Sequence, residues 1–165
     1  VMISSILDIG RTEGAQFEQA KNIDLVEFIK YKTNDYNMLA AKKSITIKFS
    51  SNVSSLQMMI QETLFNQILQ NFVQNAIKFT PNGKTIKIKL KKIDDKVTLN
   101  VIDEGIGIDE NIDVFAPFKK VGKENGVGLG LYLAKIASDA LNAKISIKNR
   151  EDGKNGAIAK LELNL

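Results

Sequence analysis

Two asparagines and a lysine recur at helical spacing in the segment ILQNFVQNAIKF, residues 68–79. Asn71, Asn75 and Lys78 stand at positions i, i+4 and i+7, so an α-helix would hold them within about 60° of one another on one side. An amide oxygen is a hard ligand that suits Mg²⁺, and a lysine beside it suits a phosphate group. Structural hydrogen bonds or a plain solvent face would explain the same pattern, so both interpretations stay open for this helix taken alone.

A second candidate group lies in NVIDEGIGID, residues 100–109. Asp103 continues the alternation of the apolar residues in 97–101, which predicts that its carboxylate projects from the buried face at the end of a strand. A buried carboxylate must accept hydrogen bonds, because burial of an unpaired charge is costly; the exocyclic amine of a base could donate one. Gly105 and Gly107 would allow close backbone approach. An ordinary Asp-Gly turn is the alternative.

A third group is rich in glycine. In NGVGLGLYLAKIA, residues 125–137, Gly126, Gly128 and Gly130 run directly into a helical pattern. Glycines at this place let backbone N–H groups and the helix dipole reach an anion, typically a phosphate. The dinucleotide fingerprint G-x-G-x-x-G is excluded, because Leu131 stands where its last glycine is required. A flexible connector is the alternative.

Apolar periodicity predicts the elements that would position these groups. Helices are expected over 25–43, 62–79 and 128–141, and strands over 45–49, 85–92, 97–103, 143–149 and 157–165. Residues 1–14 are interpreted as the end of a helix that breaks at Gly10 and Gly14. This order predicts an α/β (α+β) two-layer sandwich, in which helices cover one face of a mixed sheet.

The composition excludes several kinds of chemistry. The 165 residues suffice for one domain with a core, and they include neither Cys nor His. Disulfides, thiolate chemistry, Ser-His-Asp catalysis and the usual zinc sites are therefore excluded. The net charge is +4, but aromatic residues make up only 7% and no basic run is interleaved with them, so we expect no binding to nucleic acid.

Taken together, the motifs resemble the N, G1, F and G2 boxes of the catalytic and ATP-binding domain of sensor histidine kinases. They are Asn-x3-Asn-x2-Lys-Phe, Asp-x-Gly-x-Gly, Phe-x2-Phe and Gly-x-Gly-x-Gly, in this order. The resemblance covers nearly the whole chain and extends to the superfamily of DNA gyrase B and the large heat-shock chaperone. It implies a Bergerat-type ATP-binding fold, with a mainly antiparallel sheet and about three helices on one face. It also implies a division into 1–21, the end of a dimerisation helix and its linker, and 22–165, the catalytic ATP-binding domain.

The resemblance assigns roles by position. Asn75 matches the Mg²⁺ ligand, Asn71 a second contact to ion or phosphate, and Lys78 the lysine that contacts phosphate; Asn71 and Lys78 are the candidate catalytic residues. The remaining candidates are nucleotide-binding residues: Phe79 near the adenine, Asp103 on its amine, Gly105, Gly107 and Ile108 around the base, and Phe118, Gly126, Val127, Gly128, Leu129 and Gly130 along the lid and phosphates.

The implied function is a histidine kinase catalytic domain for two-component signalling. It would bind Mg-ATP and transfer the γ-phosphoryl group to a histidine in a dimerisation domain that is absent from this chain. The implied partners are ATP, that domain of the same protein and a response regulator. The full-length protein is expected to be a homodimer, either cytoplasmic or the cytoplasmic part of a membrane-bound sensor.

Two alternatives remain open: a nucleotide-sensing regulatory domain without phosphotransfer, and an ATP-hydrolysing conformational switch. The lid between Phe118 and Gly126, KKVGKEN, is short, which favours the first alternative. Lys119 and Lys120 stand where an arginine is common, and together with the short lid they bear on whether the lid contacts the γ-phosphate. Asn71 argues against the second, because the ATP-hydrolysing relatives carry a glutamate there and an amide cannot take a proton from water.

Overall fold

The computed structural model describes residues 2–15, 17–118 and 129–165. Its elements, in chain order, are α1 (Met2–Ala15), β1 (Lys21–Asp24), α2 (Leu25–Ala40), the 3₁₀ turn η1 (Ala41–Lys43), β2 (Thr46–Ser51), β3 (Gln57–Ile60), α3 (Glu62–Phe79), β4 (Thr85–Ile93), β5 (Lys96–Ile102), α4 (Gly130–Ala140), β6 (Lys144–Asn149) and β7 (Ala157–Asn164). The helix predicted over 62–79 coincides with α3.

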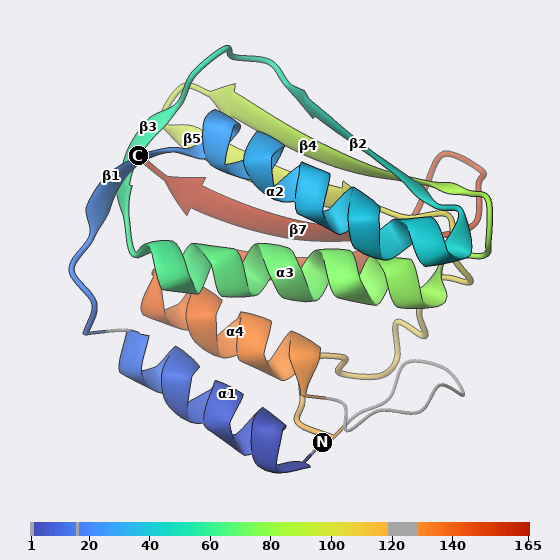
Figure 1. The fold of residues 1–165 in the computed structure, drawn as a ribbon, viewed down its shortest axis with the longest axis horizontal. Coiled ribbons are helices and arrows are strands. Elements are labelled where there is room, and N and C mark those ends of the chain that lie inside the picture. The colour runs from blue at the N-terminus through green and yellow to red at the C-terminus, as the bar shows by residue number, and fades with distance from the viewer. Residues whose placement is uncertain (1, 16, 119–128) are drawn as a thin grey trace.

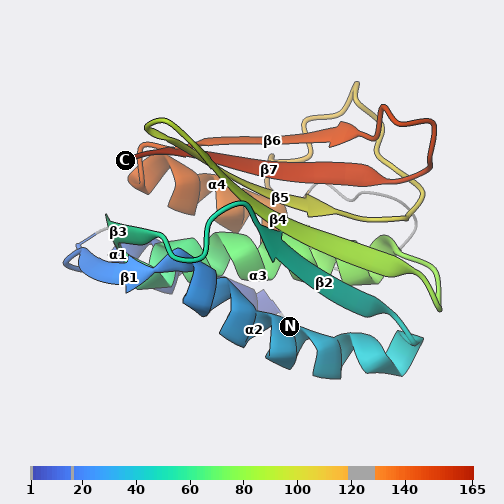
Figure 2. The same ribbon diagram turned by 90° about the horizontal axis from the view of Figure 1, so that it is seen from above.

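Five strands form the main sheet, in the order β2-β4-β5-β7-β6. β2 runs parallel to β4, and the other neighbouring strands are antiparallel. The helices α2, α3 and α4 lie over one face of this sheet (Figures 1 and 2), while β1 and β3 form a separate antiparallel pair. The predicted two-layer sandwich with a mixed, mainly antiparallel sheet and helices on one face is therefore confirmed.

The core lies between the sheet and the helical layer. On β4 and β5 every second residue is fully buried, as Ile88 and Leu99 are, because alternate side chains of a strand point to the same face. Phe65 and Phe72 of α3 are buried against them. Burial of each such side chain contributes about 1.5–3 kcal/mol, so this interface fixes α3 relative to the ends of the strands.

Three details differ from the sequence-based expectations. The helix α1 continues through Gly10 and Gly14 to Ala15, because α1 packs on α4 and α3 and this contact offsets the roughly 1 kcal/mol cost of each glycine. The strands β1 and β3, of four residues each, were not expected, since so short a stretch shows no clear alternation. The helix expected over 25–43 ends its α-helical part at Ala40 and tightens into η1.

No helix within the described ranges combines the length and the apolar character needed to cross a bilayer.

Candidate functional site

A pocket lies between α3, α4 and the inward face of the sheet, near the end of α3. Residues from all the predicted motifs except the Phe-x2-Phe pair line it or border it. The lining residues are Phe72, Asn75, Ala76, Phe79, Val101, Asp103, Gly107, Ile108, Leu131, Ile147, Ala157 and Ala159. The structure thus brings together Asn75 and Phe79 of the first motif with Asp103, Gly107 and Ile108 of the second. The enclosed part of the pocket is small, about 20 Å³, which corresponds to roughly one water molecule.

The polar residues of α3 occupy different environments. Asn71 is buried, at 8% exposure, and its Nδ2 donates to the carbonyl oxygen of Gln67 at 2.8 Å. A Cβ atom on Gly130 would lie 3.2 Å from Oδ1 of Asn71, so the first residue of α4 approaches this amide closely. Asn71 therefore sits at the contact of the two helices and is not among the residues that line the pocket.

Asn75, one turn further along α3, is half-buried and lines the pocket. Its amide makes no hydrogen bond with the part of the chain that the structure describes. The Nζ atom of Lys78 lies 5.4 Å from the centre of the Phe79 ring, beside the same pocket. Asn75 and Lys78 thus lie three residues apart in the last turns of α3.

Lys43 holds this end of α3 in place. Its Nζ donates to the carbonyl oxygens of Ile77 at 2.8 Å and Lys78 at 3.2 Å, which have no partner within the helix. A cation at a helix C-terminus also interacts favourably with the helix dipole. Lys43 thereby fixes the turn that carries Lys78 and Phe79.

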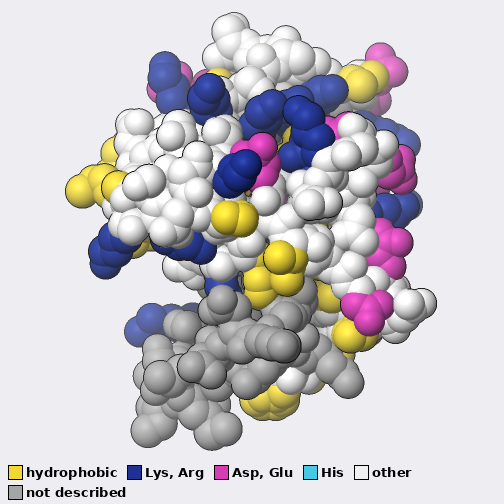
Figure 3. All heavy atoms as spheres, turned by 90° about the vertical axis from the view of Figure 1, so that its right-hand side faces the viewer, with side chains coloured by type: hydrophobic (Ala, Val, Ile, Leu, Met, Phe, Trp, Pro, Cys, Tyr) yellow, Lys and Arg dark blue, Asp and Glu magenta, His cyan; other side chains and the backbone are white. Residues whose placement is uncertain are grey.

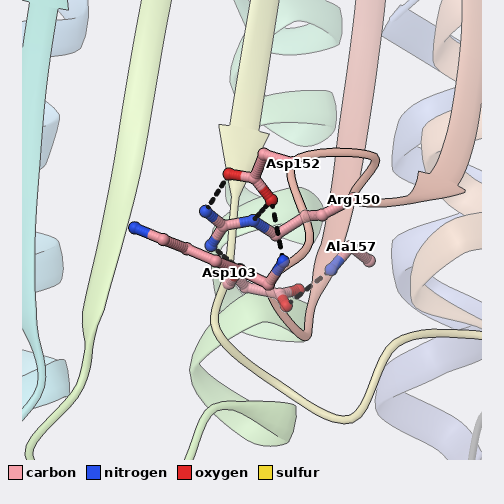
Figure 4. A network of polar contacts seen from close by, with 5 residues as sticks. Asp103, Arg150, Asp152 and Ala157 are labelled. Carbon is pink, nitrogen blue, oxygen red and sulfur yellow. Dashed lines mark hydrogen bonds and ion pairs between the residues drawn. The ribbon is translucent and has the colours of Figure 1, made fainter.

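Asp103 follows directly after β5 and faces the pocket. Its Oδ1 accepts a hydrogen bond from the backbone N–H of Ala157 at 2.9 Å (Figure 4) and another from the N–H of Gly105, also at 2.9 Å. Burial raises the pKa of Asp103, and these hydrogen bonds and the charge of Arg150 oppose that rise only in part. Oδ2 accepts no hydrogen bond within the described ranges. One oxygen of the carboxylate is therefore used to fix it, and the other is available to a ligand.

The glycines after Asp103 are required by close packing. A Cβ atom on Gly105 would lie 2.6 Å from the carbonyl oxygen of Phe79, and one on Gly107 would collide with Oδ1 of Asn149. Gly107 also has φ +80, a conformation that side chains disfavour. The loop can pass this close to α3 and β6 only because these two residues lack side chains.

Asn149, at the end of β6, is a positioning residue that the sequence did not indicate. Its Oδ1 accepts from the N–H of Ile108 at 2.7 Å, and its Nδ2 donates to the carbonyl oxygen of the same residue at 2.9 Å. Its own N–H donates to Oε1 of Glu110 at 3.0 Å. The side chain thus holds Ile108 much as a neighbouring strand would, and it fixes one wall of the pocket.

Arg150 supports Asp103 through its backbone carbonyl group (Figure 4). Its Nη1 donates to the carbonyl oxygen of Asp103 at 3.0 Å, while Nε and Nη2 bind Asp152 at 3.1 and 2.6 Å. Gly156 follows the same turn, and a Cβ atom there would collide with the carbonyl oxygen of Asp103. An isolated asparagine and arginine before a turn carry no sequence signal; only the tertiary structure brings Asn149 to Ile108 and Arg150 to Asp103.

The remaining candidate nucleotide-binding residues do not line the pocket or lie outside the described ranges. Phe118 is 61% exposed and does not line the pocket, whereas Leu129 is buried and precedes α4. Gly126, Val127 and Gly128, together with the predicted short lid, lie outside the described residues. Within the described ranges no group of three or more Asp or Glu side chains could hold a metal ion. Asn75 lines the pocket, and its amide makes no hydrogen bond to the described residues, so it is the residue that fits the role of a metal ligand.

Lys and Arg side chains gather on part of this side of the molecule. Figure 3 shows them in the upper part of the view, with Asp and Glu side chains among them and along its right-hand edge. Groups of positive side chains attract anionic ligands and raise their local concentration.

Comparison with known proteins identifies the family. Residues 60–165 match the family described as histidine kinase-, DNA gyrase B-, and HSP90-like ATPase. The sensor protein KdpD of Clostridium acetobutylicum is 30% identical over 171 residues, which cover 98% of this chain and 18% of KdpD. The chain likewise spans only 19% of the autoinducer 2 sensor kinase/phosphatase LuxQ of Vibrio vulnificus, to which it is 26% identical over 90% of its own length.

Solved structures give the same answer. The catalytic domain of histidine kinase ThkA superposes with a TM-score of 0.79 at 31% identity, over 88% of this chain and 95% of that domain. Histidine kinase ThkA in its complex with the response regulator protein TrrA superposes with a TM-score of 0.77 at 26% identity, over 99% of this chain and 48% of ThkA. The chain belongs to the family of histidine kinase-, DNA gyrase B- and HSP90-like ATPases, and it has the fold of the histidine kinase ATPase domain.

Proposed function

We propose that this chain binds Mg-ATP in the pocket beside α3 and presents the γ-phosphoryl group to a histidine in a dimerisation domain of the same protein. The observation that carries the proposal is a pair of polar groups that line one pocket and make no hydrogen bond to the residues that the structure describes. They are Oδ2 of Asp103 and the amide of Asn75. Each is the residue at which its sequence motif places a nucleotide contact.

The base would bind at the Asp103 side. An ionised carboxylate only accepts hydrogen bonds, and adenine carries an amine at the edge that would face it. Oδ1 is already held by Gly105 and Ala157, so Oδ2 keeps its direction without rearrangement. Phe79 and Ile108 supply apolar surface for the faces of the ring. Asn149 and Arg150 contribute by fixing the loop and the backbone of Asp103.

The phosphates would bind toward the end of α3. Asn75 offers an amide oxygen to Mg²⁺, Lys78 offers a positive charge to a phosphate, and the glycines before α4 would offer backbone N–H groups. Bound Mg²⁺ would neutralise negative charge on the phosphates. The contribution of the protein is then positioning and electrostatic stabilisation of the phosphoryl group.

Asn71 favours transfer to an external group over hydrolysis. Its side chain is an amide that already donates to the backbone of α3, so it cannot take a proton from a water molecule. The chain itself contains no histidine that could accept the phosphoryl group. We therefore place the acceptor in another segment of the full-length protein.

One relative supports a proposal for the wider assembly. ThkA is known in complex with the response regulator TrrA, and a response regulator is the partner we propose for the full-length protein. Residues 1–21, which include α1, would be the end of a dimerisation helix and its linker, and the full-length protein would be a homodimer. The 22–165 unit would be the cytoplasmic catalytic domain of that sensor.

The proposal is tested by phosphotransfer. The chain is joined to the segment that precedes it in its own protein and is incubated with γ-labelled ATP and Mg²⁺. Acid-labile label on a histidine of that segment is expected, whereas the 165-residue chain alone should stay unlabelled. Asn75→Ala should abolish the transfer while the protein remains folded.

Two results would count against the proposal. Tight ATP binding without any histidine label would favour a nucleotide-sensing domain. Rapid release of inorganic phosphate by the chain alone would favour an ATP-driven switch, and it would show that Asn71 does not prevent attack by water.

A further inference from the structure

The face of the main sheet that carries no helix is lined with lysines. All helices of the described ranges lie on the opposite side (Figure 2). The strand register places these lysines on the same face: Lys48 of β2, Lys87, Lys89 and Lys91 of β4, Lys96 of β5, Lys160 of β7, and Lys144 and Lys148 of β6. Eight positive side chains are thus distributed over all five strands, six of them exposed and two half-buried.

Negative charge is almost absent from this face. Within the described strands, Glu162 is the one carboxylate that shares it, and Glu162 is bound by Lys160 at 2.6 Å. The pKa of Glu162 lies below its ordinary value because Lys160 donates a hydrogen bond to it and Lys144 and Lys96 add positive charge. The other carboxylates at its margin lie beyond the strands: Asp94 and Asp95 in the turn between β4 and β5, and Glu104 after β5, where it accepts a hydrogen bond from the N–H of Thr85 at 2.7 Å.

The fold does not need this arrangement. Lys48 and Lys87 stand directly opposite each other in the β2–β4 ladder, and like charges at opposite positions destabilise a sheet. Lys89 and Lys91 continue the row along β4 on the same side. Mutual repulsion between these lysines lowers the stability of the folded chain, and an anionic partner would relieve that repulsion.

The chemistry of the face favours one class of partner. Protein–protein interfaces are depleted in lysine and are centred on aromatic, apolar or arginine side chains. On this face the strands hold eight lysines but no aromatic residue and no arginine, and its apolar members are Ile93, Ile102 and Ile158. Specific readers of nucleic acid use arginine, an element that enters a groove, or aromatic rings that stack on bases. A broad sheet on which lysines and small polar side chains such as Ser50, Thr98 and Ser146 predominate offers mainly distributed charge. Distributed charge is sufficient for adsorption to anionic lipid headgroups.

We propose that the helix-free sheet face binds peripherally to the surface of an anionic phospholipid bilayer. The pocket is compatible with such a contact, because it is lined by the inward side chains of the sheet, such as Val101 and Ala159, and by α3 and α4. Adsorption through the outward lysines leaves the helical side accessible to nucleotide. The proposal adds a membrane contact to this domain and does not depend on the kinase reaction.

The test is co-sedimentation of the 165-residue chain with vesicles of phosphatidylcholine, either pure or with about one third phosphatidylserine. A triple variant, Lys48→Gln, Lys87→Gln and Lys91→Gln, removes exposed charges from the face. A matched variant, Lys21→Gln, Lys30→Gln and Lys42→Gln, removes as many exposed charges from other elements. Melting temperature and ADP affinity establish that both variants remain folded.

We expect binding to the anionic vesicles only, lost when the ionic strength is raised to about 1 M, at which the Debye length falls to ~3 Å. The face variant should bind at least ~10-fold more weakly and the matched variant nearly as well as the wild type. Equal losses in the two variants would show that only net charge matters and would overturn the proposal. It would equally be overturned by binding to a DNA duplex or to an acidic protein without binding to anionic vesicles.

Discussion

Asp103 is the residue whose chemistry would decide which base the pocket accepts. Adenine has an amine at its six position, whereas guanine has a carbonyl oxygen there, which would set acceptor against acceptor at Oδ2. A charge-assisted hydrogen bond contributes about 1.5–3 kcal/mol, so ATP should bind at least ~10-fold more tightly than GTP. Asp103→Ala should remove most of that preference, as measured by titrating both nucleotides by calorimetry. A folded variant with an unchanged ratio would leave Asp103 a purely structural role.

The raised pKa of Asp103 makes the preference for ATP over GTP depend on pH. Burial favours the neutral form of the Asp103 carboxyl. The contribution of this carboxyl to the stability of the fold is therefore fully present below the ordinary Asp pKa of ~3.9 and is lost as the pH rises through its pKa in the folded chain. Ligand binding has the opposite requirement, since only the ionised carboxylate accepts the adenine amine, while the neutral acid could donate to guanine. The ATP-to-GTP affinity ratio should therefore narrow as the pH falls from 7 toward that value. The two nucleotides share one triphosphate, so its own titration cancels in the ratio.

Asp103→Asn provides the control for this pH dependence. An amide does not titrate in this range, so the ratio measured with the variant should stay constant from pH 7 downward. A ratio that narrows equally in the variant would assign the effect to another group, and a flat wild-type ratio would mean that Asp103 does not read the base.

At the scale of elements, the loop after β5 is held by a side chain from β6. Asn149→Ala removes both hydrogen bonds to Ile108, so the wall of the base pocket loses its support. We expect ADP affinity to fall about two- to tenfold, the range for one or two hydrogen bonds. Hydrogen exchange at the Ile108 amide should accelerate at the same time.

A matched change and a second ligand make the result for Asn149 specific. Asn164→Ala, at the exposed end of β7, should leave both readouts unchanged. Tripolyphosphate, which lacks the base, should bind the Asn149→Ala variant as well as the wild type. Equal losses for ADP and tripolyphosphate would indicate a general loosening of the fold, and the positioning role would then be wrong.

The elements also show where sequence reasoning succeeds. α3 was predicted to the residue, because its apolar pairs recur every four residues over 18 residues. Asp103 was expected to face inward because it continues the alternation of Val97, Leu99 and Val101. It does so in the structure, although β5 ends one residue earlier, at Ile102. Asn149 and Lys43 were missed, since their partners Ile108 and Ile77 lie 41 and 34 residues away in the sequence, and local periodicity carries no information about such pairs.

At the scale of the whole molecule, only the tertiary structure shows the order of the strands and the concentration of lysines on one face of the sheet. The alternation of Lys87, Lys89 and Lys91 was visible in the sequence as one solvent-facing strand. The register of β2, β5, β6 and β7 against β4 is what turns that strand into a continuous basic face. Composition gave the net charge of +4 but not its concentration on one side.

The boundary between α1 and the rest of the chain is also a whole-molecule question, and it can be tested by truncation. α1 packs on α4 and α3 through residues such as Thr12 and Ala15, but it contributes no residue to the pocket. Deletion of residues 1–20 leaves the β1–β3 pair intact. We expect a domain that melts roughly 2–8 °C lower, for a loss of ~1–2 kcal/mol, and that binds ADP as well as before.

A deletion only four residues longer should behave differently. Asp24 caps α2, and its Oδ1 accepts from the N–H groups of Val26 at 3.0 Å and Leu56 at 3.1 Å, while its Oδ2 accepts from Ser55 at 2.6 Å. Removal of residues 1–24 takes away this cap and β1 together, which leaves backbone donors without acceptors at about 1–3 kcal/mol each. Thermal unfolding of the two truncated chains should therefore differ far more than their lengths suggest. If deletion of 1–20 already abolished ADP binding, α1 would belong to the catalytic unit and the proposed boundary near residue 21 would be wrong.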